Sequence, residues 1–253
     1  MSGHLAIVGL GPGDPRYLTP AAALALAAAS DLVGYHAYLD RVPAAAHQTR
    51  HGSDNRVELD RARLALELAA AGRRVAVVSG GDPGVFAMAA AVFEALESGP
   101  PHWRALDIAV EPGVTAMLAA AAAAGAPLGG DFCTVSLSDN LKPWALVTRR
   151  LEAALAADFA LALYNPISKA RPHRLDEAFD IARRHRAGTT PVVLARAVGR
   201  PDARLAVRPL AEVKGEMADM ATLVLIGAST TRLIPRPDGS AYVYTPRFHA
   251  APA

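Results

Sequence analysis

The sequence of 253 residues contains one cysteine, Cys133, which excludes an intramolecular disulfide and a cysteine-rich metal site. A single cysteine suits a reducing compartment, and residues 1–4 lack the basic flank of a secretion signal, so we expect a cytoplasmic protein. The net charge is only +2 and aromatic residues make up 6%, so the chain offers neither a polyanion-binding field nor many stacking surfaces. We therefore expect no nucleic-acid partner.

A membrane span and a metal site are also not expected. The longest uncharged stretch, residues 112–130, is mostly alanine and is interrupted by Thr115, Gly125 and Pro127, so it predicts a packed helix rather than a membrane span. His47 and His51 have the spacing of a helical metal pair, but glycine and serine follow them and no third ligand is near. With 52% hydrophobic residues, the chain can bury a sizeable core.

Two glycine-rich turns are the most informative feature that is present. Residues 9–14 read GLGPGD and residues 79–84 read SGGDPG, and each turn follows an apolar strand. Glycine allows positive φ and lets a ligand approach the backbone closely. Asp14 replaces the third glycine of a dinucleotide fingerprint and no Lys-Ser/Thr pair follows, so a neutral or cationic ligand is favoured over a phosphate. The alternative is that Asp14 and Asp82 only close tight turns through backbone hydrogen bonds.

Strand-like and helix-like segments alternate along the chain, which predicts an α/β fold with a largely parallel N-terminal sheet covered by helices on both faces. We expect an N-terminal domain over residues 1–125 and a mixed-sheet α/β domain over residues 126–253. Thr19 and Pro20 predict a helix start, and residues 242–245 an edge strand in a peripheral tail. The expected strands are 4–9, 32–35, 75–79, 107–110, 132–137, 159–164, 191–195, 205–208 and 222–226. The expected helices are 21–30, 57–71, 85–97, 144–157 and 174–186.

Six motifs in register carry a resemblance to a known family. They are GLGPGD at 9–14, SGGDPG at 79–84, EPGVTA at 111–116, SLSD at 136–139, LYNP at 163–166 and LAR at 194–196. From about Leu5 to about Leu233 the chain resembles the tetrapyrrole (corrin and porphyrin) methyltransferases, and within them the branch acting on carbon 17 of precorrin-3B. The resemblance implies two α/β domains, S-adenosylmethionine as methyl donor with S-adenosylhomocysteine as product, ring contraction to precorrin-4 in cobalamin biosynthesis, and a homodimer.

The resemblance also implies site residues, carried over position by position. Cofactor contacts are expected at Pro12, Gly80, Gly81, Asp82, Val85, Phe86, Thr115, Ala116, Tyr164, Asn165, Ala197, Val198, Ala221 and Thr222. Val85 and Phe86 are expected to open a helix. His36 matches a proton-handling position, although a packing histidine is the plain alternative.

The tetrapyrrole carries several carboxylates, which call for cations at its binding site. Candidate substrate-binding residues are Arg16, Tyr35, Arg50, Lys169, Arg171, Arg196 and Arg200. Solvated surface charge is the alternative for these cations. Four rival functions stay open: methylation of cobalt-factor III at carbon 17, methylation of another ring carbon, ribose methylation of ribosomal RNA, and tetrapyrrole carriage without catalysis.

Overall fold

The computed structural model describes residues 3–54 and 57–248, which form two compact units. The units divide between Thr115 and Ala116, ahead of the boundary predicted after residue 125. The division falls there because helix α5 (Ala116–Ala124) packs its alanines and Met117 against strands of the second unit. The uncharged stretch therefore forms a packed helix, as predicted. Among the described residues, no helix has the length and apolar character needed to cross a bilayer.

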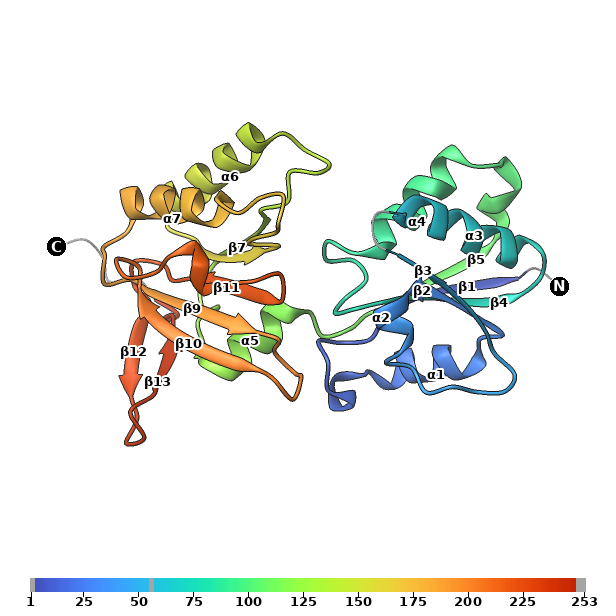
Figure 1. The fold of residues 1–253 in the computed structure, drawn as a ribbon, viewed down its shortest axis with the longest axis horizontal. Coiled ribbons are helices and arrows are strands. Elements are labelled where there is room, and N and C mark those ends of the chain that lie inside the picture. The colour runs from blue at the N-terminus through green and yellow to red at the C-terminus, as the bar shows by residue number, and fades with distance from the viewer. Residues whose placement is uncertain (1–2, 55–56, 249–253) are drawn as a thin grey trace. The chain divides into compact units, whose positions relative to one another are not determined.

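The first unit is a parallel five-stranded sheet in the order β3-β2-β4-β1-β5, with helices on both faces (Figure 1). Helices α3 and α4 pack on one face, and α1 and α2 pack on the other. The strands are β1 (His4–Gly9), β2 (Asp31–Tyr35), β3 (Thr49–Ser53), β4 (Arg74–Ser79) and β5 (Asp107–Glu111). The helices are α1 (Pro20–Ala28), α2 (His36–Leu39), α3 (Glu58–Ala70) and α4 (Met88–Ser98), with short 3₁₀ helices at Pro15–Tyr17 and Pro101–Ala105.

Local sequence explains the start and end of two of these helices. The Thr19 side chain accepts a hydrogen bond from the N–H of Ala22, and Pro20 follows as the first residue of α1, as predicted. Helix α3 ends before Gly72, whose φ of +86° suits a glycine at a helix end. The helix predicted from residue 85 is wrong at its start: α4 begins at Met88, because Phe86 has a φ of +53° and Ala87 is extended.

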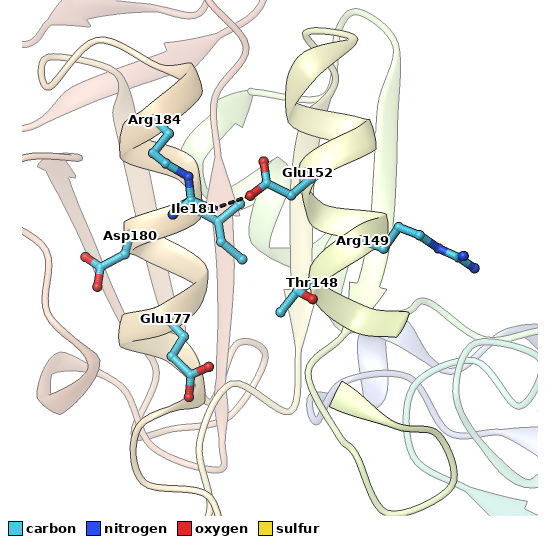
Figure 2. A pocket seen from close by; sticks show the side chains of 7 residues that line it. All are labelled: Thr148, Arg149, Glu152, Glu177, Asp180, Ile181 and Arg184. Carbon is cyan, nitrogen blue, oxygen red and sulfur yellow. Dashed lines mark hydrogen bonds and ion pairs between the residues drawn. The ribbon is translucent and has the colours of Figure 1, made fainter. Parts of the chain in front are cut away.

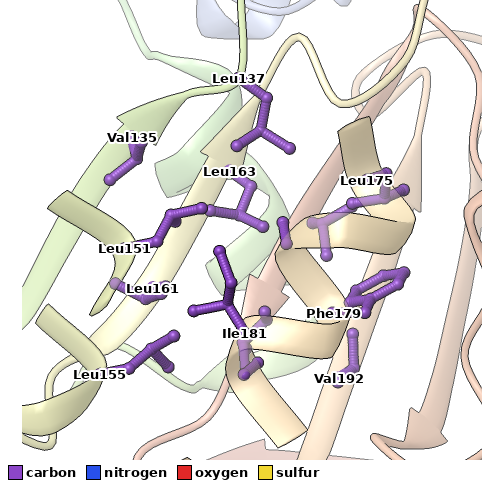
Figure 3. Close-up of a cluster of buried hydrophobic side chains, with 14 of the residues drawn as sticks. Val135, Leu137, Leu151, Leu155, Leu161, Leu163, Leu175, Phe179, Ile181 and Val192 are labelled. Carbon is purple, nitrogen blue, oxygen red and sulfur yellow. The ribbon is translucent and has the colours of Figure 1, made fainter. Parts of the chain in front are cut away.

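The second unit has a mixed five-stranded sheet in the order β10-β9-β11-β8-β7, in which only β7 and β8 pair in parallel. Helices α6 (Trp144–Ala156) and α7 (Arg174–His185) cover one face, and their leucines and Phe179 fill the core with those of the sheet (Figure 3). A short 3₁₀ helix spans Gly215–Met217. The strands are β7 (Phe132–Ser136), β8 (Ala160–Tyr164), β9 (Pro191–Arg196), β10 (Arg204–Pro209) and β11 (Thr222–Ile226).

A small three-stranded sheet, in the order β12-β13-β6, lies with α5 against the other face of the second unit. Its strands are β6 (Gly125–Ala126), β12 (Arg232–Pro235) and β13 (Ala241–Tyr244). The prediction of an edge strand at residues 242–245 was wrong, because β13 pairs on both sides. Val243 is 1% exposed, so the tail contributes to the core rather than lying at the periphery.

Candidate functional site

The two predicted glycine turns follow neighbouring strands of the parallel sheet. Strands β1 and β4 pair side by side, and the helices after them, α1 and α4, cover opposite faces. This arrangement is a topological switch point, and open α/β sheets bind ligands there, outside the carboxyl ends of the strands. The sheet therefore places the first turn (residues 9–14) and the second turn (residues 79–84) at the position where a ligand is expected.

Backbone hydrogen bonds join the first turn to the second. Gly11 and Gly81 exchange two bonds, with N to O distances of 3.1 and 2.9 Å. Both glycines have positive φ, near +68° and +66°, a conformation that costs other residues free energy. Arg41, which lies outside the turn, stabilises the first turn, because its Nη2 donates to the carbonyl oxygens of Leu10 and Gly11 at 3.1 and 2.8 Å. No sequence pattern marks Arg41, which lies 30 residues from Gly11 along the chain.

A third turn, residues 112–115 after β5, lies against the other two. A Cβ added at Gly113 would lie 2.2 Å from the carbonyl oxygen of Gly81, and one added at Gly9 would lie 2.7 Å from that same oxygen. Asp82 accepts hydrogen bonds from the N–H groups of Gly84 and Gly113, at 2.8 and 3.0 Å. The three turns therefore form one closely packed backbone cluster, and its glycines are required for the packing.

Asp14 closes its own turn through hydrogen bonds, which is the structural alternative considered for this residue in the sequence. Its carboxylate accepts hydrogen bonds from the N–H and guanidinium of Arg16, at 2.9 to 3.0 Å, and caps the 3₁₀ helix that follows. These bonds hold the pKa of Asp14 below its usual range. Arg16, a predicted substrate residue, is thus paired with Asp14 at the first turn.

Aromatic and imidazole rings lie at the same edge of the first unit. His36 begins α2 directly after β2, and a Cβ on Gly52 of β3 would lie 2.4 Å from its ring atoms Cε1 and Nδ1. Tyr38 packs on Gly80 of the second turn, and its ring meets that of Tyr35 edge to face at 5.5 Å. His36 therefore lies against β3, two residues before Tyr38, which packs on the second turn and is a neighbour that the sequence did not single out.

The predicted cofactor residues of the second unit lie around the strand ends of its sheet. The Tyr164 hydroxyl accepts a hydrogen bond from the N–H of Met117 at 3.0 Å, next to Ala116. The N–H of Ala197 donates to the carbonyl oxygen of Ala221 at 2.9 Å, and Asp219 accepts from the N–H of Ala221 and the hydroxyl of Thr222. Val198 packs against the apolar cluster beneath.

Backbone strain coincides with the predicted cofactor positions. Among the described residues, four non-glycine residues have positive φ: Phe86 (+53°), Asp158 (+62°), Asn165 (+52°) and Ala197 (+49°). Three of the four were predicted cofactor contacts, and such strain persists where function or packing requires it. Small residues and backbone groups in these turns suit a ligand that carries both charges and apolar parts, as S-adenosylmethionine does.

The predicted substrate cations are mostly held by partners within their own unit. Arg50 donates to the carbonyl oxygens of Leu39 and Val42, at 2.9 and 2.6 Å. Arg196 bonds to both Asp202 and Asp219, at 2.8 and 2.7 Å. Arg171 is 9% exposed and donates to the Leu137 carbonyl oxygen. Lys169 and Arg200 are exposed.

No metal cluster is found among the described residues, since no three His, Cys, Asp or Glu side chains gather there. The histidine spacing noted in the sequence is not helical, because His51 lies in β3 and its Nε2 contacts Asp31 Oδ1 at 2.9 Å. His47 lies 3.3 Å from the carbonyl oxygen of Ala27.

A separate groove of about 520 Å³ lies between α6 and α7, open to solvent (Figure 2). Its walls are mostly charged, and Glu152 and Arg184 bond across it. None of the residues that line the groove is a predicted cofactor residue, so we assign it no part in the site. Its lining residues are Thr148, Arg149, Glu152, Glu177, Asp180, Ile181 and Arg184.

Glycine turns packed at the switch point of a parallel sheet, followed by a second α/β unit, define the class: a two-unit α/β protein with backbone turns clustered at the carboxyl edge of its first sheet. More particularly, the chain belongs to the tetrapyrrole (corrin/porphyrin) methylases, whose family model matches residues 4–214. The predicted family and fold class are confirmed.

Relatives match over nearly the whole chain. A precorrin-3B C(17)-methyltransferase from Sinorhizobium sp is 56% identical over 99% of this chain and 98% of its own. A probable cobalt-factor III C(17)-methyltransferase from Salmonella typhimurium (strain LT2) is 38% identical over 90% of this chain and 93% of its own. The crystal structure of the methyltransferase CobJ superposes with a TM-score of 0.92, at 51% identity, over 97% of this chain and 100% of that one.

Proposed function

We propose that this protein transfers a methyl group from S-adenosylmethionine to carbon 17 of precorrin-3B, with ring contraction to precorrin-4, in cobalamin biosynthesis. The single observation that carries the proposal is the full-length identity of 56% to a precorrin-3B C(17)-methyltransferase. A match of that extent covers both units, so it includes the parts that would hold the donor and the parts that would hold the ring.

The glycine cluster supports the choice of donor. S-adenosylmethionine would supply an electrophilic methyl group on a sulfonium cation. Backbone groups of the second turn, together with Asp82, offer acceptors to a cationic ligand, and they offer no lysine to a nucleotide phosphate. Asp82 keeps further acceptor capacity, because an ionised carboxylate has about four lone-pair sites and two are used by Gly84 and Gly113.

Direct displacement at a methyl carbon needs alignment and exclusion of water more than it needs an acid. We assign that positioning role to the cofactor residues predicted from the sequence: Pro12, Gly80, Gly81, Val85, Phe86, Thr115 and Ala116 from the first unit, with Tyr164, Asn165, Ala197, Val198, Ala221 and Thr222 from the second. Ring contraction requires protons to move, and His36 is the proposed proton-handling group. Tyr35 and the cations Arg16, Arg50, Lys169, Arg171, Arg196 and Arg200 remain the proposed contacts of the substrate. Within the described residues, the side chains of Lys169 and Arg200 make no hydrogen bond or ion pair, which leaves them available to a ligand.

The experiment that tests the proposal mixes the protein with methyl-labelled S-adenosylmethionine and either precorrin-3B or cobalt-factor III. Label entering precorrin-3B with formation of a contracted ring supports the proposal. Transfer only to cobalt-factor III supports the second candidate, which the 38% identity to a probable cobalt-factor III enzyme favours. Retention of either tetrapyrrole without transfer would indicate a carrier and would contradict both.

We further propose a homodimer in the cytoplasm. The single cysteine, Cys133, lies partly buried in β7 and suits a reducing compartment. Sedimentation equilibrium of the purified protein tests the dimer, and fractionation of the producing cell tests the compartment.

A further inference from the structure

The loops after β7 and β8 form one surface in the second unit. These strands run in parallel with Ser136 opposite Tyr164, so residues 137–143 and 165–171 leave the sheet at the same edge. The amide of Asn165 donates to the Ser136 hydroxyl at 2.9 Å. Arg171 donates to the carbonyl oxygen of Leu137 at 3.0 Å. This surface, called here the β7/β8 loop pair, is therefore tied together beside Tyr164 and Asn165, two of the proposed cofactor residues.

Cations outnumber carboxylates at the β7/β8 loop pair. Asp139 serves two arginines, with Arg174 at 3.1 Å and Arg171 at 3.6 Å. Arg174 is occupied further, since it also contacts Glu177 and lies 4.4 Å from the centre of the Trp144 ring. No such partner serves Lys142: within the described part of the chain its ammonium makes no hydrogen bond or ion pair.

Lys142 is held in an unfavourable environment for a charge. It is half-buried, and burial lowers its pKa, with repulsion from Arg150 and Arg171 lowering it further against the attraction of Asp139. A flexible lysine side chain ordinarily avoids such surroundings by extending into water. The positive end of the helix dipole of α6 begins two residues later, which adds to the field. An anion placed here would relieve the repulsion.

The neighbouring residue indicates the kind of anion. Leu141 directly precedes Lys142 in the sequence and is 98% exposed, so the same loop presents a fully exposed apolar side chain and a cation. A tetrapyrrole presents the same combination, with carboxylate side chains on an apolar ring. We propose that Lys142, at the β7/β8 loop pair, binds a carboxylate side chain of the tetrapyrrole substrate. This inference rests on the proposed function, and it assigns Lys142 as a substrate-positioning residue of the second unit.

The test compares Lys142→Met with Lys142→Arg and with Lys214→Met, a control at an exposed lysine of the same unit. Three quantities are measured for each variant: the dissociation constant of S-adenosylhomocysteine by calorimetry, and kcat and KM for precorrin-3B. Loss of a charge-assisted hydrogen bond should raise KM about 10- to 100-fold in Lys142→Met. Lys142→Arg should recover most of that loss, whereas S-adenosylhomocysteine affinity should stay unchanged in every variant.

Salt provides a second readout. Raised sodium chloride should increase KM of the wild type more than that of Lys142→Met, because the variant has already lost the charge that salt screens. An active wild type whose KM is unaffected by Lys142→Met, or equally affected by Lys214→Met, would overturn this inference alone. A wild type that binds S-adenosylhomocysteine but methylates neither precorrin-3B nor cobalt-factor III would overturn the proposed function, and this inference with it.

Discussion

The carboxylate of Asp82 accepts a hydrogen bond from the backbone N–H of Gly113, with 3.0 Å between Oδ2 and N. Its other oxygen, Oδ1, accepts from the N–H of Gly84 at 2.8 Å and closes the second turn. The residues lie 31 positions apart in the sequence and follow different strands, β4 and β5. One side chain thus holds two of the three turns of the proposed cofactor site, and its structural and binding roles must be separated by experiment.

Substitution of Asp82 separates those roles. Asp82→Ala removes the acceptor for two backbone N–H groups, so we expect the free energy of unfolding to fall by about 1–3 kcal/mol while the fold persists. The dissociation constant of S-adenosylhomocysteine should rise at least about tenfold. Asp14→Ala is the matched control, because Asp14 caps only its own turn and should leave that constant unchanged. Calorimetry showing normal affinity in Asp82→Ala would refute the binding role.

The close packing of the turns predicts that one methyl group added at Gly113 lowers the free energy of unfolding. Gly113→Ala would place Cβ 2.2 Å from the carbonyl oxygen of Gly81, so the backbone must shift, at a cost of about 1–3 kcal/mol in unfolding free energy. Gly188→Ala is the control. A Cβ added at this surface glycine would lie 3.1 Å from its nearest neighbour, the Cβ of Ala211. Urea unfolding that gave equal stabilities for the two variants would contradict the close packing of the three turns.

Phe86 offers a test of backbone strain with an internal reference. Its φ of +53° disfavours any residue with a Cβ, so Phe86→Gly should be about 1 kcal/mol more stable than Phe86→Ala, although both lose the ring. At Phe93, inside helix α4 and also exposed, the order should reverse, because glycine destabilises a helix interior by about 1 kcal/mol relative to alanine. Both variants at position 86 should bind S-adenosylhomocysteine more weakly if Phe86 contacts the donor. Thermal unfolding and calorimetry measure the two effects separately.

Local signals in the sequence predicted much of the fold. The bounds of β1 agree with the prediction, and Thr19 with Pro20 marked the start of α1, because strand alternation and capping depend on neighbours in sequence. Strand β3 was missed because its residues, Thr49–Ser53, have no apolar pattern and its position is set by pairing with β2. The left-handed conformation of Phe86 was missed for a similar reason, since a phenylalanine gives no local indication of positive φ.

The glycine turns of the candidate site could be predicted from the sequence, whereas the side chains that hold those turns in place could not. GLGPGD and SGGDPG each marked a turn, but their contact depends on the strand order, which no local pattern states. Arg41 bonds to the first turn and Tyr38 packs on the second. In the sequence, Arg41 resembles an ordinary loop residue and Tyr38 an ordinary helix residue. Of the predicted substrate cations, Arg50 was identified by its residue type, and its bonds to Leu39 and Val42 follow only from the folded chain.

A buried carboxylate in the first unit predicts a dependence of stability on pH. Asp31 is 2% exposed; burial raises its pKa, but hydrogen bonds from Arg73, His51 and Ser30 lower it more, so the net shift is downward. The stabilisation is therefore present above the pKa of an unfolded aspartate, about 3.9, and is lost as pH falls through the lower folded value. Asp31→Asn should cost about 1–3 kcal/mol at neutral pH, where Arg73 loses its ion pair with the Asp31 carboxylate, and less in acid. Unfolding free energies of wild type and variant that stayed equally far apart from neutral pH to the acid limit would contradict this role.

The last prediction concerns the proposed proton-handling group. General acid–base catalysis contributes about 10²- to 10⁴-fold, so His36→Ala should lower the rate of contracted-ring formation by at least about 10²-fold. S-adenosylhomocysteine affinity should be unchanged, because His36 is proposed to act on the ring and not on the donor. His47→Ala is the control, since the hydrogen bond of that imidazole within the described residues is to the carbonyl oxygen of Ala27, away from the proposed proton transfer.

Gly52→Ala provides a second route to the same group without removing the imidazole. The added Cβ would lie 2.4 Å from two atoms of the His36 ring, so the ring must move while its chemistry is retained. We expect turnover to fall and donor affinity to persist, as in His36→Ala, because catalysis by a side chain depends on its position within a fraction of an ångström. Full turnover in His36→Ala would show that the histidine only packs on β3. Impaired turnover in His36→Ala with normal turnover in Gly52→Ala would show that the position of the ring over Gly52 is not the reactive one.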